Sequence, residues 1–213
     1  MIQKFASEVT KWLEDENVIS YKDYALFAYA AYSFIFGLLP VFIVATLGLA
    51  FGMIREGLIM ILPFMVIRKF SGGYHLKSSK ICVILSTTLL VLGLTCIKAI
   101  VQKGDTTILS LLVFLSVVSV CIFSPVENAS RKMTEAERQL FHKITCVLAM
   151  GFMALYFIIS RVLPIQNSIA LGIGVLLVAV LQIPYVLKKI ILKFCQKIIE
   201  LISLLNKMFI DRY

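Results

Sequence analysis

Long apolar runs separated by short polar segments cover almost the whole chain. The first run, residues 24–54, has no charged side chain and exceeds the ~20 apolar residues that a helix needs to cross a bilayer. A second run, 57–67, follows directly after Arg55 and Glu56, and it is too short to span on its own. We therefore expect residues 24–67 to form a helical hairpin.

Four more apolar runs follow, and each has the length of a membrane-spanning or nearly spanning helix. They cover residues 81–97, 107–123, 144–160 and about 165–187. A basic loop, 68–80, and a polar segment, 124–143, lie between runs. The pattern predicts an all-α polytopic membrane protein with a single domain, in which residues 24–187 form a core of about six transmembrane helices.

Both ends of the chain are amphipathic. In residues 1–23, Ile2, Phe5, Val9 and Trp12 share one helical face, which is typical of a helix lying on the membrane surface. Residues 188–213 form a basic amphipathic tail that either anchors the protein at the membrane or docks an amphipathic partner peptide. We expect no cleavable signal peptide, because the charged amino-terminal segment lacks a compact apolar core.

Composition narrows the class of protein further. Hydrophobic residues make up 60% of the 213 residues and charged residues 15%, whereas soluble domains have about 50% and 25%. These values exclude a soluble globular enzyme and a disordered protein. The net charge of +9 favours anionic membrane lipids as partners, and the absence of a nucleic-acid-binding motif argues against nucleic acid.

The distribution of lysine and arginine predicts the orientation. With six spans and a cytoplasmic amino terminus, only Arg55, Lys98, Lys103 and Arg161 lie outside. All other basic residues then face the cytoplasm, as the positive-inside rule requires. We expect a multi-pass protein of the cell membrane with both termini and the basic loop 68–80 on the cytoplasmic side.

Few residues in the chain can carry chemistry. The chain has no H-E-x-x-H, G-x-S-x-G or P-loop motif, and its scarcity of carboxylates inside apolar runs argues against a proton-coupled transporter. Two histidines and five scattered cysteines make a poor metal site, so we expect no metal and no cofactor. We interpret the cysteines as free thiols and His142 as an interfacial residue without a catalytic role.

One cluster of reactive residues remains, in the segment R-K-F-S-G-G-Y-H-L-K-S-S-K-I-C from Arg68 to Cys82. His75 and Cys82 are too far apart on a continuous helix to form a hydrogen bond, since seven residues rise ~10.5 Å. A loop at His75, given backbone freedom by Gly72 and Gly73, would allow them to meet.

The surroundings of Cys82 favour a thiolate. Ser78 or Ser79 can cap a helix that begins just before Cys82, and a helix amino terminus lowers the pKa of a thiol. Lys77 and Lys80 act in the same direction. The alternative is a headgroup-facing histidine and a packing cysteine without chemistry.

At these residues the chain resembles the accessory gene regulator B (AgrB) family of membrane cysteine endopeptidases. The family pattern is an arginine, a small pair, a histidine and a cysteine seven positions later, here Arg68, Gly72–Gly73, His75 and Cys82. A second feature is a polar loop after the fourth span, here Ser124-Pro125-Val126-Glu127-Asn128 followed by Lys132. Where other members carry an Asn-Lys-Pro-Leu-like run, this chain has residues 129–133 (ASRKM).

The resemblance implies an activity and a partner. Family members cleave the acidic carboxyl-terminal tail from a short AgrD-like propeptide of quorum sensing and close a thiolactone or lactone ring, without a cofactor. Carried over, Cys82 is the nucleophile and His75 the general base and acid. Arg68, Lys69, Lys77 and Lys80 would attract the acidic tail, with Arg68 as a carboxylate clamp. The two loops would be shaped by Gly72, Gly73, Ser79, Pro125, Glu127 and Asn128. The resemblance also implies a homodimer.

Two other classes of function remain open on the residues alone. A peptide exporter or permease without proteolytic chemistry would transport its peptide even without Cys82. A non-enzymatic membrane scaffold would tolerate substitution throughout residues 68–82.

Overall fold

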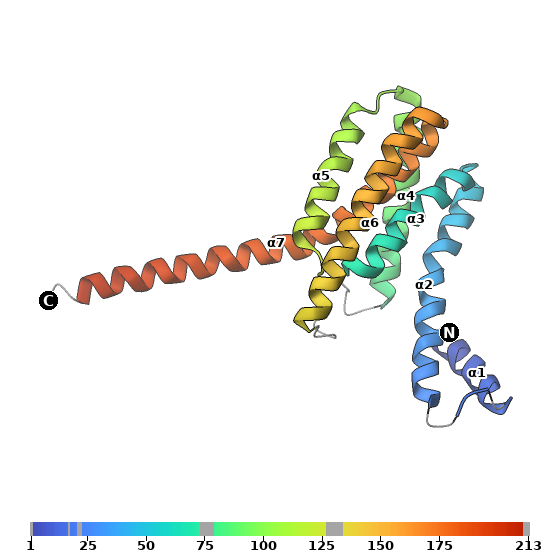
Figure 1. Cartoon of the computed structure of the whole chain (residues 1–213), viewed down its shortest axis with the longest axis horizontal. Coiled ribbons are helices and arrows are strands. Elements are labelled where there is room, and N and C mark those ends of the chain that lie inside the picture. The colour runs from blue at the N-terminus through green and yellow to red at the C-terminus, as the bar shows by residue number, and fades with distance from the viewer. Residues whose placement is uncertain (1, 17, 21–22, 73–78, 127–133, 211–213) are drawn as a thin grey trace.

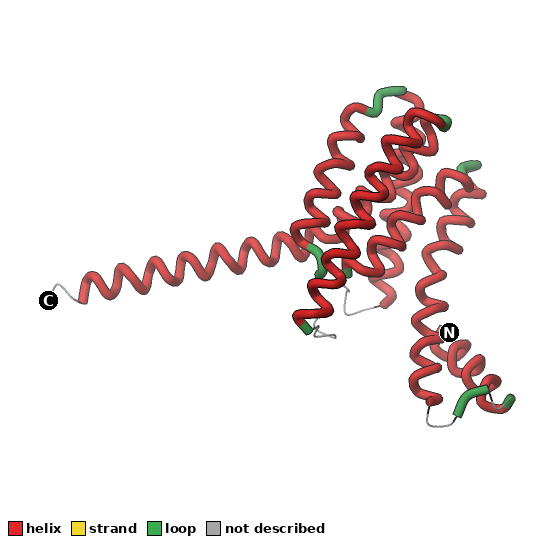
Figure 2. The backbone as a smooth tube through the Cα atoms, viewed as in Figure 1, coloured by secondary structure: helices red, strands yellow, loops and turns green. Residues whose placement is uncertain are grey.

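The described part of the protein is helical. The computed structural model describes all residues except 1, 17, 21–22, 73–78, 127–133 and 211–213, and omits side chains at 2–3, 79–80, 82, 189–190, 193 and 200–210. The described residues form helices joined by short connections, with no strand among them (Figure 2). The prediction of an all-α protein is therefore confirmed.

The helices follow the apolar runs of the sequence. They are α1 (Ile2–Asp15), α2 (Tyr24–Phe51), α3 (Ile54–Ser71), α4 (Ser79–Lys103), α5 (Thr107–Phe123), α6 (Glu135–Val162) and α7 (Ile165–Ile210).

Several helices suit a membrane. Within the described part of the chain, four segments are long and apolar enough to cross one: α2, residues Val83–Lys103 of α4, α6, and residues Ile165–Lys188 of α7. Helix α5 is apolar but shorter, with 17 residues, and α3 is an 18-residue helix with Arg55 and Glu56 near its start and Arg68 and Lys69 near its end. The architecture fits a multi-pass membrane protein, while the number of six spans stays a prediction.

The core of the bundle lies around the first half of α7. This half packs against α3, α4, α5 and α6, and its residues from Asn167 to Val175 are buried without interruption (Figure 1). Helices α7 and α3 approach closely at Gly174, where a Cβ atom would collide with the carbonyl oxygen of Met60. Small residues at such crossings allow backbones to touch, which strengthens packing where helices cannot rely on the hydrophobic effect.

The predicted hairpin is formed by α2 and α3, and its turn lies at Gly52 and Met53. Gly52 ends α2 in the left-handed conformation, with φ of 67°, and its N–H bonds the carbonyl oxygens of Gly48 and Leu49. Gly48 faces the start of α3, because a Cβ atom there would lie 2.7 Å from Ile54 Cα. Gly48 and Gly52 therefore allow α2 and α3 to meet closely at this turn.

The two ends of the chain lie outside the bundle (Figure 1). Helix α1 packs on α2 through Ala6 and Thr10, while Phe5 and Trp12 remain exposed. Helix α7 continues without interruption into the predicted tail, and Pro184 lies where its packed half ends. Beyond that point the helix extends sideways from the bundle, and its described side chains from Leu187 onward are exposed.

Candidate functional site

The reactive segment joins α3 to α4. Arg68 and Lys69 lie in the last turn of α3, and Cys82 is the fourth residue of α4, which begins at Ser79. The backbone of Cys82 is thus in the first helical turn, where the helix dipole acts on a thiol most strongly.

Several residues of the predicted site belong to segments that the structure does not describe. Gly73, His75 and Lys77 lie outside the described residues, as do Glu127 and Asn128 of the second loop. The side chains of Ser79, Lys80 and Cys82 also lie outside the description. The pairing of His75 with Cys82 therefore stays a prediction.

The two predicted loops meet at their described ends. Gly72, directly after α3, forms an isolated parallel bridge with Val126, and Val126 N donates to Ser71 O at 2.8 Å. Gly72 has φ of 69° and ψ of −165°, a conformation that is essentially restricted to glycine. A Cβ atom on Gly72 would also lie 2.5 Å from Val126 O. The segment that leads to His75 therefore starts from a fixed point against the turn 124–126.

The turn 124–126 is itself tied to the last two helices. Ser124, Pro125 and Val126 are buried, and the Ser124–Pro125 peptide bond is cis. Gln182 of α7, only 1% exposed, donates from Nε2 to Ser124 Oγ at 2.9 Å. His142 Nδ1 of α6 lies 2.9 Å from Ser124 O. The turn is thus connected to α3, α6 and α7 by hydrogen bonds.

The position of His142 determines which of its nitrogens carries a proton. A carbonyl oxygen can only accept, so Nδ1 donates to Ser124 O, and in the neutral ring Nε2 is left as an acceptor. Nε2 faces Cys146 Sγ at 3.8 Å, and this sulfur also lies 4.0 Å from Cys121 O. The sequence interpretation of His142 as a simple interfacial residue missed this role in holding the turn.

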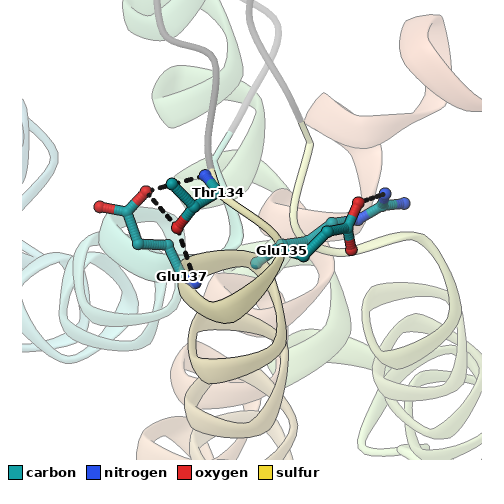
Figure 3. A network of polar contacts seen from close by, with 4 residues as sticks. Thr134, Glu135 and Glu137 are labelled. Carbon is teal, nitrogen blue, oxygen red and sulfur yellow. Dashed lines mark hydrogen bonds and ion pairs between the residues drawn. The ribbon is translucent and has the colours of Figure 1, made fainter.

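Helix α6 begins at Glu135, nine residues after Val126 at the end of the turn and earlier than the apolar run suggests. Thr134 Oγ1 accepts from Glu137 N at 3.3 Å, and Glu137 Oε2 accepts from Thr134 N at 3.0 Å, so the two form a capping box (Figure 3). Glu135 and Arg138 add an exposed ion pair at 3.9 Å. The T-x-x-E signature starts the helix at Glu135, before the predicted span 144–160.

The last turn of α3 is basic. The guanidinium of Arg68 is half-buried and lies 5.4 Å from the ring centroid of Phe64. Lys69 is exposed, and its ammonium lies 6.0 Å from the ring of Phe70. The last turn of α3 contains no acidic residue, and neither does the first turn of α4. The end of α3 is therefore basic, while α6, which packs on α3, carries Glu135 and Glu137 in its first turn.

Among the described residues, no group of three histidine, cysteine, aspartate or glutamate side chains is arranged to hold a metal ion. Cys96, Cys121, Cys146 and Cys195 are free thiols.

The helical bundle with several potential spans defines a polytopic membrane protein. Its candidate site lies at one end of the bundle, where the basic end of α3 adjoins the bridge between Gly72 and Val126. Comparison with known families identifies it more closely. The model of the family Accessory gene regulator B (AgrB) matches residues 3–186, and the chain belongs to this family.

Two curated relatives support this membership. A protein of Clostridium perfringens (strain SM101 / Type A), described only as AgrB-like, is 27% identical over 92% of this chain and 95% of its own length. A second protein described as AgrB-like, from Clostridium perfringens (strain 13 / Type A), is 35% identical over 39% of this chain and 35% of its own length. No solved structure matches the chain.

Sequence reasoning did not single out Gln182, which lies in an otherwise apolar helix. A buried amide of this kind usually has a polar partner, and that rule is the signal by which Gln182 could have been found.

Proposed function

We propose that the protein is a membrane cysteine endopeptidase that removes the carboxyl-terminal tail of an AgrD-like propeptide and promotes closure of a thiolactone or lactone ring. The observation that carries this proposal is the family match, because residues 3–186 include both His75 and Cys82. The location of Cys82 in the first turn of α4 supports it as a chemical argument.

The proposed nucleophile is the thiolate of Cys82. The amino terminus of α4 and the neighbouring charges of Lys77 and Lys80 stabilise the negative sulfur. His75 takes the thiol proton and holds it for the leaving group. The bridge between Gly72 and Val126 supports the pairing of His75 with Cys82, because it fixes the position of Gly72, from which the chain continues to His75.

The reaction has two steps. Cys82 Sγ attacks the carbonyl carbon of the scissile peptide bond, the C–N bond breaks, and His75 gives its proton to the departing amine, leaving a thioester on Cys82. A cysteine thiol or serine hydroxyl of the propeptide core then attacks this thioester and gives its proton to His75, the C–S bond to Cys82 breaks, and the ring closes with release of the Cys82 thiolate. Transfer between two thiols is nearly balanced in energy, so ring closure needs no ATP when the tail is removed. Exclusion of water favours the ring over a linear hydrolysis product.

The cations at this end of the bundle would bind the acidic tail. Arg68 is the proposed carboxylate clamp, because a guanidinium can donate two parallel hydrogen bonds to one carboxylate. The positive electrostatic potential of Lys69, Lys77 and Lys80 would attract the acidic tail toward the site.

The same proposal places the site on the cytoplasmic side. The positive-inside rule, applied to six spans, puts both termini and the segment 68–82 in the cytoplasm. The propeptide would therefore reach Cys82 from the side on which it is synthesised.

The test is a cleavage assay on the full-length protein in liposomes with a candidate propeptide, followed by mass spectrometry. We expect the wild type to release the tail and to carry a trapped acyl mass on Cys82. The Cys82→Ala variant should do neither. Cys96→Ala is the matched control, since Cys96 is an exposed free thiol on the same helix, and it should cleave like the wild type. His75→Ala should also abolish cleavage.

Cleavage that survives both Cys82→Ala and His75→Ala would refute the proposal. Transport of an uncut peptide by a folded Cys82→Ala protein, with no cleavage by the wild type, would favour the exporter instead.

A further inference from the structure

An apolar cavity of about 580 Å³ lies between α2, α3 and α4. Phe34, Gly37 and Ile43 of α2 form one wall, and Phe64 of α3 and Val83 of α4 lie opposite. The volume lies within the range of sites that bind small molecules in proteins.

One part of the cavity is cationic. Arg68 and Lys69, from the last turn of α3, are the charged residues of the lining, and none of the described lining residues is acidic. The half-buried guanidinium of Arg68 is a positive charge in the cavity lining and attracts a phosphate. The exposed ammonium of Lys69 adds a second positive charge. A ligand that fits this lining has an apolar body and a negative head.

The outer wall of the cavity belongs to a helix that suits a membrane. Helix α2 is one of the four potential spans, and it exposes Phe34 and Phe42 at 69% and 66%. Phe34 both lines the cavity and contributes to this exposed surface. An acyl chain from the surrounding bilayer can therefore enter from the side without passing through water.

We propose that this cavity binds one anionic phospholipid, with an acyl chain between α2, α3 and α4 and its phosphate at Arg68 and Lys69. Basic pockets between transmembrane helices on the cytoplasmic side are suited to anionic lipid headgroups. The charge of the lining selects the headgroup, while the apolar walls hold the chain. The inference concerns lipid binding and does not require proteolytic activity, although the lipid site shares Arg68 and Lys69 with the proposed binding site of the acidic tail.

Native mass spectrometry of the full-length protein in neutral detergent tests the apolar part. Equal amounts of phosphatidylglycerol and phosphatidylcholine are added, and we expect selective retention of one phosphatidylglycerol. Gly37→Leu should abolish this retention, because a Cβ atom at Gly37 meets no atom within 4 Å and the side chain can fill the cavity. Gly151→Leu is the matched control: Gly151 is equally unobstructed but lies on α6, away from the cavity.

Lys69→Gln tests the headgroup part. One lysine near an anionic lipid contributes about 1 kcal/mol, so phosphatidylglycerol should bind about fivefold more weakly. Lys143→Gln, an exposed lysine on α6, should leave binding unchanged. Circular dichroism of each variant verifies that the helices are intact.

Three results would overturn the proposal. Equal retention of the two lipids would remove the role of the charge, and equal retention by Gly37→Leu and Gly151→Leu would remove the role of the cavity. Displacement of the lipid by an equimolar acidic, apolar peptide would assign the cavity to a peptide.

Discussion

Substitution of Gly72 by alanine should slow propeptide cleavage strongly while leaving the helical bundle intact. Gly72 holds φ of 69° and ψ of −165°, and a residue with a side chain pays on the order of 1–3 kcal/mol in that region. The new Cβ atom would also lie 2.5 Å from Val126 O, so the bridge between the two loops has to open.

The size of the effect follows from these energies. If the segment that carries His75 moves to relieve the strain, the competent arrangement of the site becomes less stable by the same free energy. The fraction of molecules in that arrangement then falls accordingly. At about 1.4 kcal/mol for each factor of ten, 1–3 kcal/mol corresponds to a decrease of roughly 5-fold to 150-fold in the cleavage rate. The opening also removes the hydrogen bond from Val126 N to Ser71 O, which adds about 1 kcal/mol.

The assay is a single-turnover measurement of tail release in liposomes, with thermal unfolding of each variant in detergent. Gly52→Ala is the matched control, because Gly52 also has a positive φ, of 67°, but lies at the opposite end of α3 with no atom within 4 Å of a new Cβ. We expect Gly52→Ala to cleave at nearly the wild-type rate. Wild-type cleavage by Gly72→Ala, or an equal loss in both variants, would refute the reasoning.

Three further substitutions test contacts of the bundle by thermal unfolding in detergent. Gln182→Leu removes the donor to Ser124 Oγ and should lower the free energy of unfolding by about 1 kcal/mol, with a decrease in cleavage as well; unchanged cleavage would show that this tie does not matter to the site. Thr134→Ala removes the cap of α6 and should cost about 0.5–2 kcal/mol, so an unchanged melting temperature would contradict the role of the capping box. Tyr156→Phe loses the 2.9 Å hydrogen bond to Ser110 Oγ and should cost about 1 kcal/mol, and an equally stable variant would count against that bond.

Helices α2 to α7 could be predicted because each one contains a long apolar run, and α1 because its apolar residues share one helical face. The helix boundaries were harder, since they depend on local polar contacts. The apolar pattern starts one span at residue 144, whereas α6 starts at Glu135 because Thr134 and Glu137 cap it. The pattern likewise divides residues 165–187 from a separate tail, whereas α7 continues as one helix through Pro184.

The candidate site was predictable only in part. The spacing of Gly72, His75 and Cys82 indicates a reactive segment, and the start of α4 at Ser79 places Cys82 in a first helical turn. The contact between Gly72 and Val126 joins residues far apart in the sequence, so no local pattern contains it. The hydrogen bond of Gln182 to Ser124 is hidden for the same reason.

That same tie between α7 and the turn has a consequence for biosynthesis. The chain is made from its amino terminus, and Gln182 is added about 110 residues after Gly72. At roughly 5–20 residues per second, this delay lasts about 6 to 22 seconds. A nascent chain can therefore expose its reactive segment well before the last helix arrives to hold the turn beside it. The turn reaches its full set of hydrogen bonds only when the final span of the bundle has been inserted.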